Sequence, residues 1–194
     1  MNNLASKQSD IKLLLMVSVA CILLFVTVHF VAEPIISEIP VTRSDIRFNA
    51  TKAYEYASKL ATSFPNRHTG SDGAFQAFIW LQDELRGMGY EVYVQEFEVM
   101  IEDRRKGRNL YVIHESDRAE AVAVLANYDM APMSFQAASD TAGQVGVLLE
   151  LVRLIKEVST NRAVVFALVD SEEWGCRAPN ILSRIMKDRL SKRS

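Results

Sequence analysis

The chain has 194 residues, of which 49% are hydrophobic and 24% charged, and its formal net charge is −2. Basic residues are interleaved with acidic ones, so we expect no nucleic-acid-binding surface. The two cysteines, Cys21 and Cys176, lie far apart in different kinds of segment, so we expect no disulfide-framed fold.

The first predicted element is an apolar helix over residues 13–32, a run without a charged residue. At about 1.5 Å per residue, such a helix spans a hydrocarbon core of roughly 30 Å. Two lysines precede the run and two glutamates follow it, so the positive-inside rule predicts a cytosolic N-terminus and an extracytoplasmic remainder. We therefore expect a cytosolic tail over residues 1–12, a single transmembrane helix over 13–32, and a lipid bilayer as a partner.

Two other interpretations of this run stay open. A cleaved signal peptide would have a shorter apolar region and small residues before the cut, which Phe30-Val31-Ala32 does not provide. Ser18-Val19-Ala20-Cys21 faintly resembles a lipoprotein cleavage site, but the apolar run continues beyond Cys21.

Residues 33–48 are predicted to be a linker, because Pro34 cannot continue the hydrogen-bond ladder of a helix. The next three residues, Asn49-Ala50-Thr51, form a glycosylation sequon on the outer side, or Asn49 caps the following helix. The remaining residues, 49–194, are expected to form one partial domain.

The elements of this domain follow from the spacing of apolar residues. Strict alternation over residues 90–99 predicts a half-buried strand, and the all-apolar run 121–126 predicts a buried central strand. A basic cluster, Arg104, Arg105, Lys106 and Arg108, is predicted to be a solvated loop. The expected order is helix 49–63, helix 73–88, strand 90–99, strand 109–114, strand 121–126, helix 142–158, strand 162–170 and a helix from about residue 179. Such alternation predicts an α/β fold with helices on both faces of a sheet.

Acidic residues follow both apolar strands. Asp129 comes after the first, Asp170, Glu172 and Glu173 come after the second, and Asp140 opens the helix between them. Ligand sites in such sheets gather at the carboxyl ends of strands, and close carboxylates repel one another unless a cation or protons compensate. One interpretation is a hydrolytic metal site, in which one carboxylate binds the metal and its neighbour takes a proton from water. The other is an exposed acidic loop with Asp140 as a helix N-cap.

Four segments in order resemble the di-zinc aminopeptidases of metallopeptidase family twenty-eight. They are Asn66-Arg67-His68-Thr69-Gly70-Ser71 with the later Met88-Gly89-Tyr90-Glu91-Val92, Ala126-Asn127-Tyr128-Asp129, the block Ala137 to Gly143, and Phe166 to Gly175. The resemblance covers residues 50–182. It implies a mixed, mostly parallel sheet flanked by helices, as in zinc exopeptidases and other phosphorylase/hydrolase-like folds, and a C-terminal part that lies beyond this chain.

The resemblance also assigns roles. Asp140 would bridge two zinc ions, Glu173 would bind one of them, and Glu172 would be the catalytic general base. Asp129 would orient the site as a second-shell carboxylate. Substrates would be peptide or protein N-termini, hydrolysed outside the cytosol.

The chain departs from the family pattern in ways that matter for zinc. Asn127 stands where the family has a metal-binding histidine, so it is an altered ligand. The family's remaining acid and histidine ligands lie beyond residue 182, while His68 and His114 lie outside the matched positions. We expect this chain alone to be inactive. It is either a truncated form of a membrane-anchored metallopeptidase or a non-catalytic binding or scaffold domain that has lost its metals; a cyclase-like acyl transfer is the third alternative.

Overall fold

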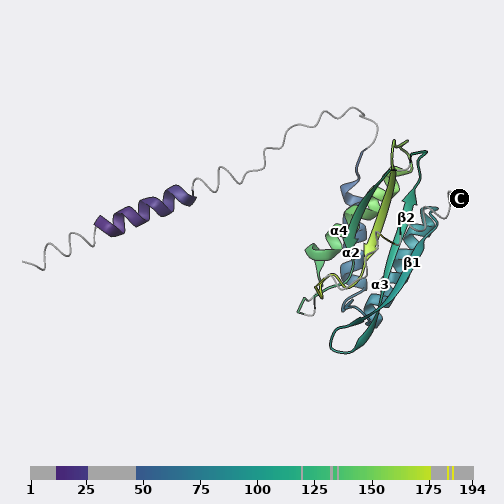
Figure 1. The fold of residues 1–194 in the computed structure, drawn as a ribbon, viewed down its shortest axis with the longest axis horizontal. Helices are drawn as coiled ribbons and strands as arrows, with labels where there is room; N and C mark the ends of the chain where they lie inside the picture. Colours follow the sequence, from purple (N-terminus) through teal and green to yellow (C-terminus); the bar gives the residue numbers. More distant parts are fainter. Residues whose placement is uncertain are drawn as a thin grey trace, which may run out of the picture. The chain divides into compact units, whose positions relative to one another are not determined.

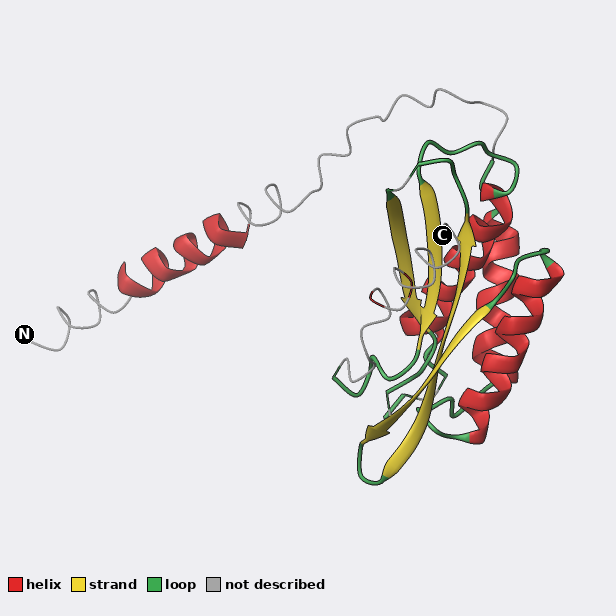
Figure 2. Ribbon diagram, turned by 45° about the vertical axis from the view of Figure 1, so that its right-hand side comes forward, coloured by secondary structure: helices red, strands yellow, loops and turns green. Residues whose placement is uncertain are grey.

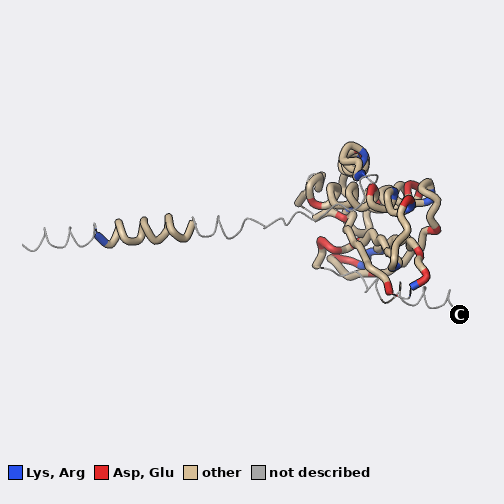
Figure 3. The backbone as a smooth tube through the Cα atoms, turned by 90° about the horizontal axis from the view of Figure 1, so that it is seen from above, with Lys and Arg blue, Asp and Glu red and all other residues tan. Residues whose placement is uncertain are grey.

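The computed structural model describes residues 12–25, 47–118, 120–131, 133–134, 136–175, 183 and 185. Contacts divide the chain into two units, Met1–Ser44 and Asp45–Ser194. In the first unit, residues 12–25 are helical, and the basic Lys12 at its start is the one charged residue of this stretch (Figure 3). No helix among the described residues has both the length and the apolar character needed to cross a membrane. The rest of the predicted span, 26–32, and most of the linker lie outside the described residues.

The described residues of the second unit form three α-helices, a short helical segment and one sheet (Figure 1). The order along the chain is α2 (Ala50–Ser63), α3 (Asp72–Gly87), β1 (Tyr93–Met100), β2 (Arg104–His114), β3 (Ala121–Asn127), η1 (Ala138–Gly143), α4 (Gln144–Ile155) and β4 (Ala163–Val169). The strands form one four-stranded sheet in the order β1-β2-β4-β3. The helices and strands predicted between residues 49 and 170 therefore exist, with bounds that differ by up to about five residues, whereas the helix predicted from about residue 179 lies mostly outside the described residues.

Side-chain caps explain where the first two helices begin. Asn49 accepts a hydrogen bond from the backbone N–H of Lys52, so it caps α2. Ser71 accepts one from the N–H of Ala74 and caps α3. Helix α3 ends before Gly89, whose φ of 78° is the left-handed conformation that glycine adopts freely.

The structure corrects the prediction for the basic cluster. Residues 104–108 are not a loop but the first half of β2, which pairs antiparallel with β1. Arg104 lies opposite Met100, and its guanidinium contacts Glu98 at 3.3 Å; Arg108 lies opposite Glu96 and contacts it at 3.0 Å. Opposite charges across the pair support strand pairing, which is why a charge-rich segment forms a strand here.

The sheet is mixed, but it is not mostly parallel in its described part. β1–β2 and β2–β4 are antiparallel, and only β3–β4 is parallel. β3, predicted to be central and buried, lies at the edge of the described sheet, and its Val122 and Leu125 are 45% and 46% exposed. An all-apolar run does not by itself distinguish a central strand from an edge strand.

The main core lies between the sheet and the helices α2, α3 and α4, which Figure 2 shows on one face of the sheet. Residues alternate between the two faces: Phe166 and Leu168 of β4 join this core, whereas Val165 and Ala167 face the other side. Ile185 packs on that second face and is buried. It is one of two described residues of the predicted last helix, whose remainder lies outside the described residues.

Candidate functional site

The parallel pair β3–β4 brings the two acidic segments together. Asn127, the last residue of β3, lies opposite Val169, the last residue of β4. The next backbone N–H, that of Tyr128, donates to the carbonyl of Val169 at 3.0 Å. The residues after both strands therefore emerge at the same edge, as the sequence predicted for strands that run in the same direction.

Asp129 is the buried residue that joins the two segments. Its side chain is fully buried, and it accepts hydrogen bonds from the backbone N–H groups of Glu172 at 3.4 Å and Glu173 at 3.2 Å. Burial raises its pKa to about 7, and the nearby charge of Asp170 adds to this effect. Asp129 thus holds the backbone that carries both glutamates, which is the geometry that the orienting role requires.

Asn127 presents its amide N–H group to carboxylates. Its Nδ2 donates to Glu173 Oε1 at 3.3 Å and to Asp129 Oδ1 at 3.4 Å. In this arrangement the side chain acts as a hydrogen-bond donor between two acids. These hydrogen bonds lower the pKa of both acids, against the larger raising effect of burial.

Asp140 lies inside η1, where its backbone leaves the helical conformation at φ −113° and ψ 98°. This extended residue separates two helical turns, of which Ala137 precedes the first, so the alternative that Asp140 caps the helix after it stays a prediction. The exposed Asp140 carboxylate accepts a hydrogen bond from Gln144 Nε2 at 3.1 Å, and the Asp140–Thr141 peptide is cis. Thr141 is buried and donates to the carbonyl of Asp129 at 3.1 Å, so the turn with Asp140 is tied to the end of β3.

Three of the predicted site residues share a surface pocket of about 380 Å³. It is lined by Leu125, Ala126, Asn127, Asp140, Gln144, Val169 and Glu172. Glu173 lies beside it, hydrogen-bonded to Asn127. Burial raises the pKa of Glu173, and the charges of Asp140 and Glu172 raise it further, so these carboxylates are close enough to repel one another.

One further acid of the predicted cluster is used elsewhere. Asp170 turns away from the pocket: its Oδ1 accepts from Thr69 Oγ1 at 2.8 Å, and its Oδ2 from the N–H of Arg108 at 3.1 Å. Ser171, with a φ of 68°, separates Asp170 from the two glutamates. A left-handed non-glycine residue is costly and is retained where surrounding contacts demand it. His68 and His114 bond to the carbonyls of Met130 and Val158 and are not part of the acidic pocket.

The residues at this edge fit only part of a zinc site. Asp140 and Glu173 offer carboxylate oxygens, but zinc sites in proteins are built largely from histidine nitrogen and cysteine sulfur. Among the described residues, no group of three or more His, Cys, Asp and Glu side chains is arranged to hold a metal ion. Two carboxylates and a donating amide do not complete a zinc site, so ligands from outside the described residues would be needed.

Sequence reasoning missed Arg67, which is fully buried and bonds to the carbonyls of Tyr128, Gln136 and Ala137. Its position within the matched Asn66–Ser71 segment was the available signal. Periodicity could not show it, because Arg67 lies in a loop and its partners are about 60 to 70 residues away along the chain.

Comparisons with known proteins agree with this fold. Residues 109–189 match the model of Peptidase family M28. The chain is 27% identical over 153 residues to the alkaline phosphatase isozyme conversion protein of Escherichia coli (strain K12), covering 66% of this chain and 44% of that protein.

Among solved structures, the glutaminyl cyclase of Fimbriiglobus ruber matches with a TM-score of 0.61 and 25% identity, covering 66% of this chain and 47% of that one. A leucine aminopeptidase precursor from Bacteroides thetaiotaomicron matches with a TM-score of 0.61 and 22% identity, covering 69% of this chain and 50% of that one. A Zn-dependent exopeptidase from Parabacteroides distasonis gives a TM-score of 0.59 and 24% identity, covering 69% and 49%. The predicted resemblance to zinc-dependent exopeptidases is confirmed, and the chain spans about half the length of these relatives.

Proposed function

We propose, from the match to Peptidase family M28, that this chain carries the carboxylate part of a zinc-dependent, aminopeptidase-type hydrolytic site. One observation supports the proposal most directly: Asp140 and Glu172 line one pocket at the ends of β3 and β4, with Glu173 beside them. Mutual repulsion of acids at a strand-end pocket is costly, and a divalent cation relieves it.

Each acid has a separate task in this proposal. Asp140 and Glu173 bind metal, two zinc ions by resemblance, together with ligands from outside the described residues. A bound zinc ion would lower the pKa of its water molecule to about 7. Glu172 accepts the proton of the attacking water and returns it to the departing amine. Asp129 keeps both glutamates in place through their backbone N–H groups. Substrates are peptide or protein N-termini.

Zinc titration and hydrolysis assays on the protein expressed from its own gene, read past codon 194 wherever the reading frame continues, test this proposal. Asp140→Asn and Glu173→Gln should each weaken zinc binding by at least about tenfold, the effect that the loss of even an outer hydrogen-bond partner has. Glu172→Gln should keep the zinc affinity of the wild type and lower release of 4-nitroaniline from leucine 4-nitroanilide by about 10²–10⁴-fold. Asp103→Asn, at an exposed residue of the β1–β2 turn, is the matched control and should change neither.

Three outcomes would count against the proposal, in part or as a whole. Full hydrolysis by Glu172→Gln would remove that residue from the mechanism. A folded wild-type chain that takes up no zinc would contradict the metallopeptidase proposal as a whole. Because glutaminyl cyclases share this fold, the assay includes an N-terminal glutaminyl peptide, whose cyclisation would indicate acyl transfer instead.

The second candidate is a non-catalytic, peptidase-like binding domain. The hydrogen bonds from Asn127 to Asp129 and Glu173 favour it, because they stabilise the acids without a metal. In the same titration, Asn127→His would supply the missing imidazole. Zinc uptake by this variant but not by the wild type would support the binding-domain function.

We also propose that the protein is anchored in a membrane by residues 13–32, with its N-terminus in the cytosol and the peptidase-like unit outside it. The charge-free apolar run and the lysines before it support this arrangement.

A further inference from the structure

Arg67 is a buried cation whose hydrogen bonds all end on backbone carbonyls. Its exposed fraction is 0%. Nε donates to the carbonyl of Tyr128 at 2.8 Å, and Nη1 donates to those of Gln136 at 3.0 Å and Phe64 at 3.4 Å. Nη2 donates to the carbonyl of Ala137 at 3.0 Å. One planar guanidinium therefore connects the loop before α3 with both ends of segment 128–137.

Segment 128–137 connects the end of β3 with the turn that contains Asp140. It begins directly after Asn127 and ends at Ala137, whose carbonyl also accepts the N–H groups of Thr141 and Ala142 at 3.0 Å each. Arg67 therefore bonds to the same oxygen that starts the turn containing Asp140. Ala137 itself has a φ of 46°, a strained conformation that persists where surrounding contacts impose it.

The residues after Arg67 hold the same neighbourhood. His68 Nδ1 lies 3.1 Å from the carbonyl of Met130, and Thr69 donates to Asp170 at the end of β4. Three consecutive residues of one loop thus contact both acidic segments. Of these three residues, Arg67 is the one that bonds to the carbonyl of Ala137 and so bears on the position of Asp140.

Burying the Arg67 cation costs free energy, which its contacts must offset. Burial lowers the pKa of Arg67 to about 10, and the charge of Asp129 opposes that shift. A buried charge is costly unless its donors are satisfied, and here four carbonyls accept hydrogen bonds from Arg67. An apolar residue in the same space would leave those four carbonyls without this donor.

We propose that Arg67 is a positioning residue of the acidic site: it ties the end of β3 to the turn at Ala137 and thereby sets where Asp140 lies relative to Asp129 and the glutamates. This role deepens the proposed function. It is also a statement about the metal-free fold, which can be tested without turnover.

Hydrogen–deuterium exchange on the purified, metal-free full chain tests the proposal. Arg67→Met keeps the length and removes the donors. Arg67→Lys keeps the charge but not the planar fork that reaches several carbonyls. Both should raise exchange across residues 128–143 by about 10–100-fold relative to β2 and β4, the effect expected when a charged hydrogen bond is lost from a local opening equilibrium. Arg104→Met, in which an exposed arginine that does not line the pocket is lost, is the control and should leave 128–143 unchanged.

A spectroscopic readout separates positioning from general loss of stability. The side-chain amide signal of Asn127 reports its bonds to Asp129 and Glu173 and should shift in both Arg67 variants but not in Arg104→Met. If Arg67→Met does not fold, Arg67→Lys decides. Wild-type exchange in Arg67→Lys, or equal acceleration in every element, overturns the proposal. Failure to bind zinc in the wild type would overturn the proposed function alone, because neither readout here involves a metal.

Discussion

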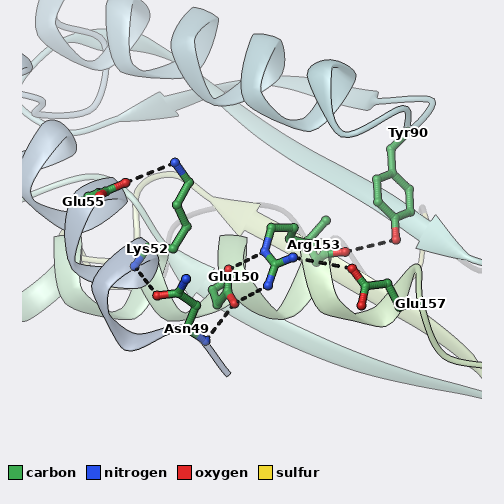
Figure 4. Close-up of polar contacts among 8 residues, drawn as sticks. Asn49, Lys52, Glu55, Tyr90, Glu150, Arg153 and Glu157 are labelled. Carbon is green, nitrogen blue, oxygen red and sulfur yellow. Dashed lines mark hydrogen bonds and ion pairs between the residues drawn. The ribbon is translucent and has the colours of Figure 1, made fainter. Parts of the chain in front are cut away.

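At the scale of single residues, Glu150 on α4 is a buried acid outside the site with three hydrogen bonds (Figure 4). Its side chain is fully buried. Oε2 accepts from Arg153 Nε at 2.8 Å, while Oε1 accepts from Arg153 Nη2 at 2.8 Å and from the backbone N–H of Asn49 at 2.9 Å. The carboxylate therefore anchors the start of α2 onto α4, which positions the helices beneath the site.

This geometry predicts an acid-dependent stability. The hydrogen bonds from Arg153 lower the pKa of Glu150 below its ordinary 4.5. Burial opposes this shift, and the hydrogen bond from the N–H of Asn49 lowers the pKa further. A lowered folded-state pKa contributes stability that is fully present above pH 4.5 and is lost as the pH falls through the folded value. Glu150→Gln should cost about 2–3 kcal/mol at pH 7, and this difference from the wild type should shrink below pH 4.5.

Urea unfolding of both chains between pH 7 and pH 3 measures this effect. Glu157→Gln is the control, because Glu157 is 64% exposed and lies 3.6 Å from the same arginine. Its loss should change stability by less than about 1 kcal/mol. A constant difference between Glu150→Gln and the wild type across the whole pH range would refute the linkage.

At the scale of elements, α2 and α4 approach closely at a glycine. A Cβ at Gly146 would lie 2.3 Å from the carbonyl oxygen of Ala53 and 2.9 Å from the Cβ of Ala57. Gly146→Ala should therefore destabilise the fold by about 1–3 kcal/mol, because backbone and not a flexible side chain blocks the space. Gly87→Ala, where a Cβ meets nothing within 4 Å, should stabilise α3 by about 0.5–1 kcal/mol. Chemical denaturation of the two variants gives the comparison, and equal effects would contradict the close packing of α2 on α4.

Elements were predictable where burial is local and periodic. The face of α2 that contains Ala53, Tyr56 and Leu60 is buried as its helical spacing predicts. Pairing is not local, so the sequence predicted neither that the charged residues of β2 would pair with β1 nor that β3 would lie at an edge. Those features depend on which strands become neighbours.

The same division applies to the site. Acids after two adjacent parallel strands predicted that Asp129, Glu172 and Asp140 would approach one another, because the topology brings the strand ends together. The direction of each side chain was not predictable. Ser171 turns Asp170 away from the pocket, and Asn127 points its amide N–H at two carboxylates. Arg67 became visible only through contacts across the fold.

At the scale of the whole molecule, the apolar N-terminal run and the folded unit differ in how far their apolar side chains are exposed. Large apolar side chains between Leu13 and Phe25 are 48–74% exposed, which water disfavours and lipid accepts. These residues surround the helix instead of forming one face, the pattern of a segment buried in an apolar phase.

The full chain should therefore sediment with membranes and resist alkaline extraction, with the peptidase-like unit exposed on the side opposite the N-terminus. Ile22→Arg places a charge near the middle of the run and costs about 2.5–3.5 kcal/mol of insertion, so it should raise the extractable fraction, whereas Ile22→Leu should not.

Sequencing the N-terminus of the mature protein distinguishes the anchor from a leader. A start after Ala32 would indicate a cleaved signal peptide, and a start at Cys21 a lipoprotein. An intact N-terminus on extractable protein would refute membrane insertion, because exposed apolar residues would then be tolerated in water.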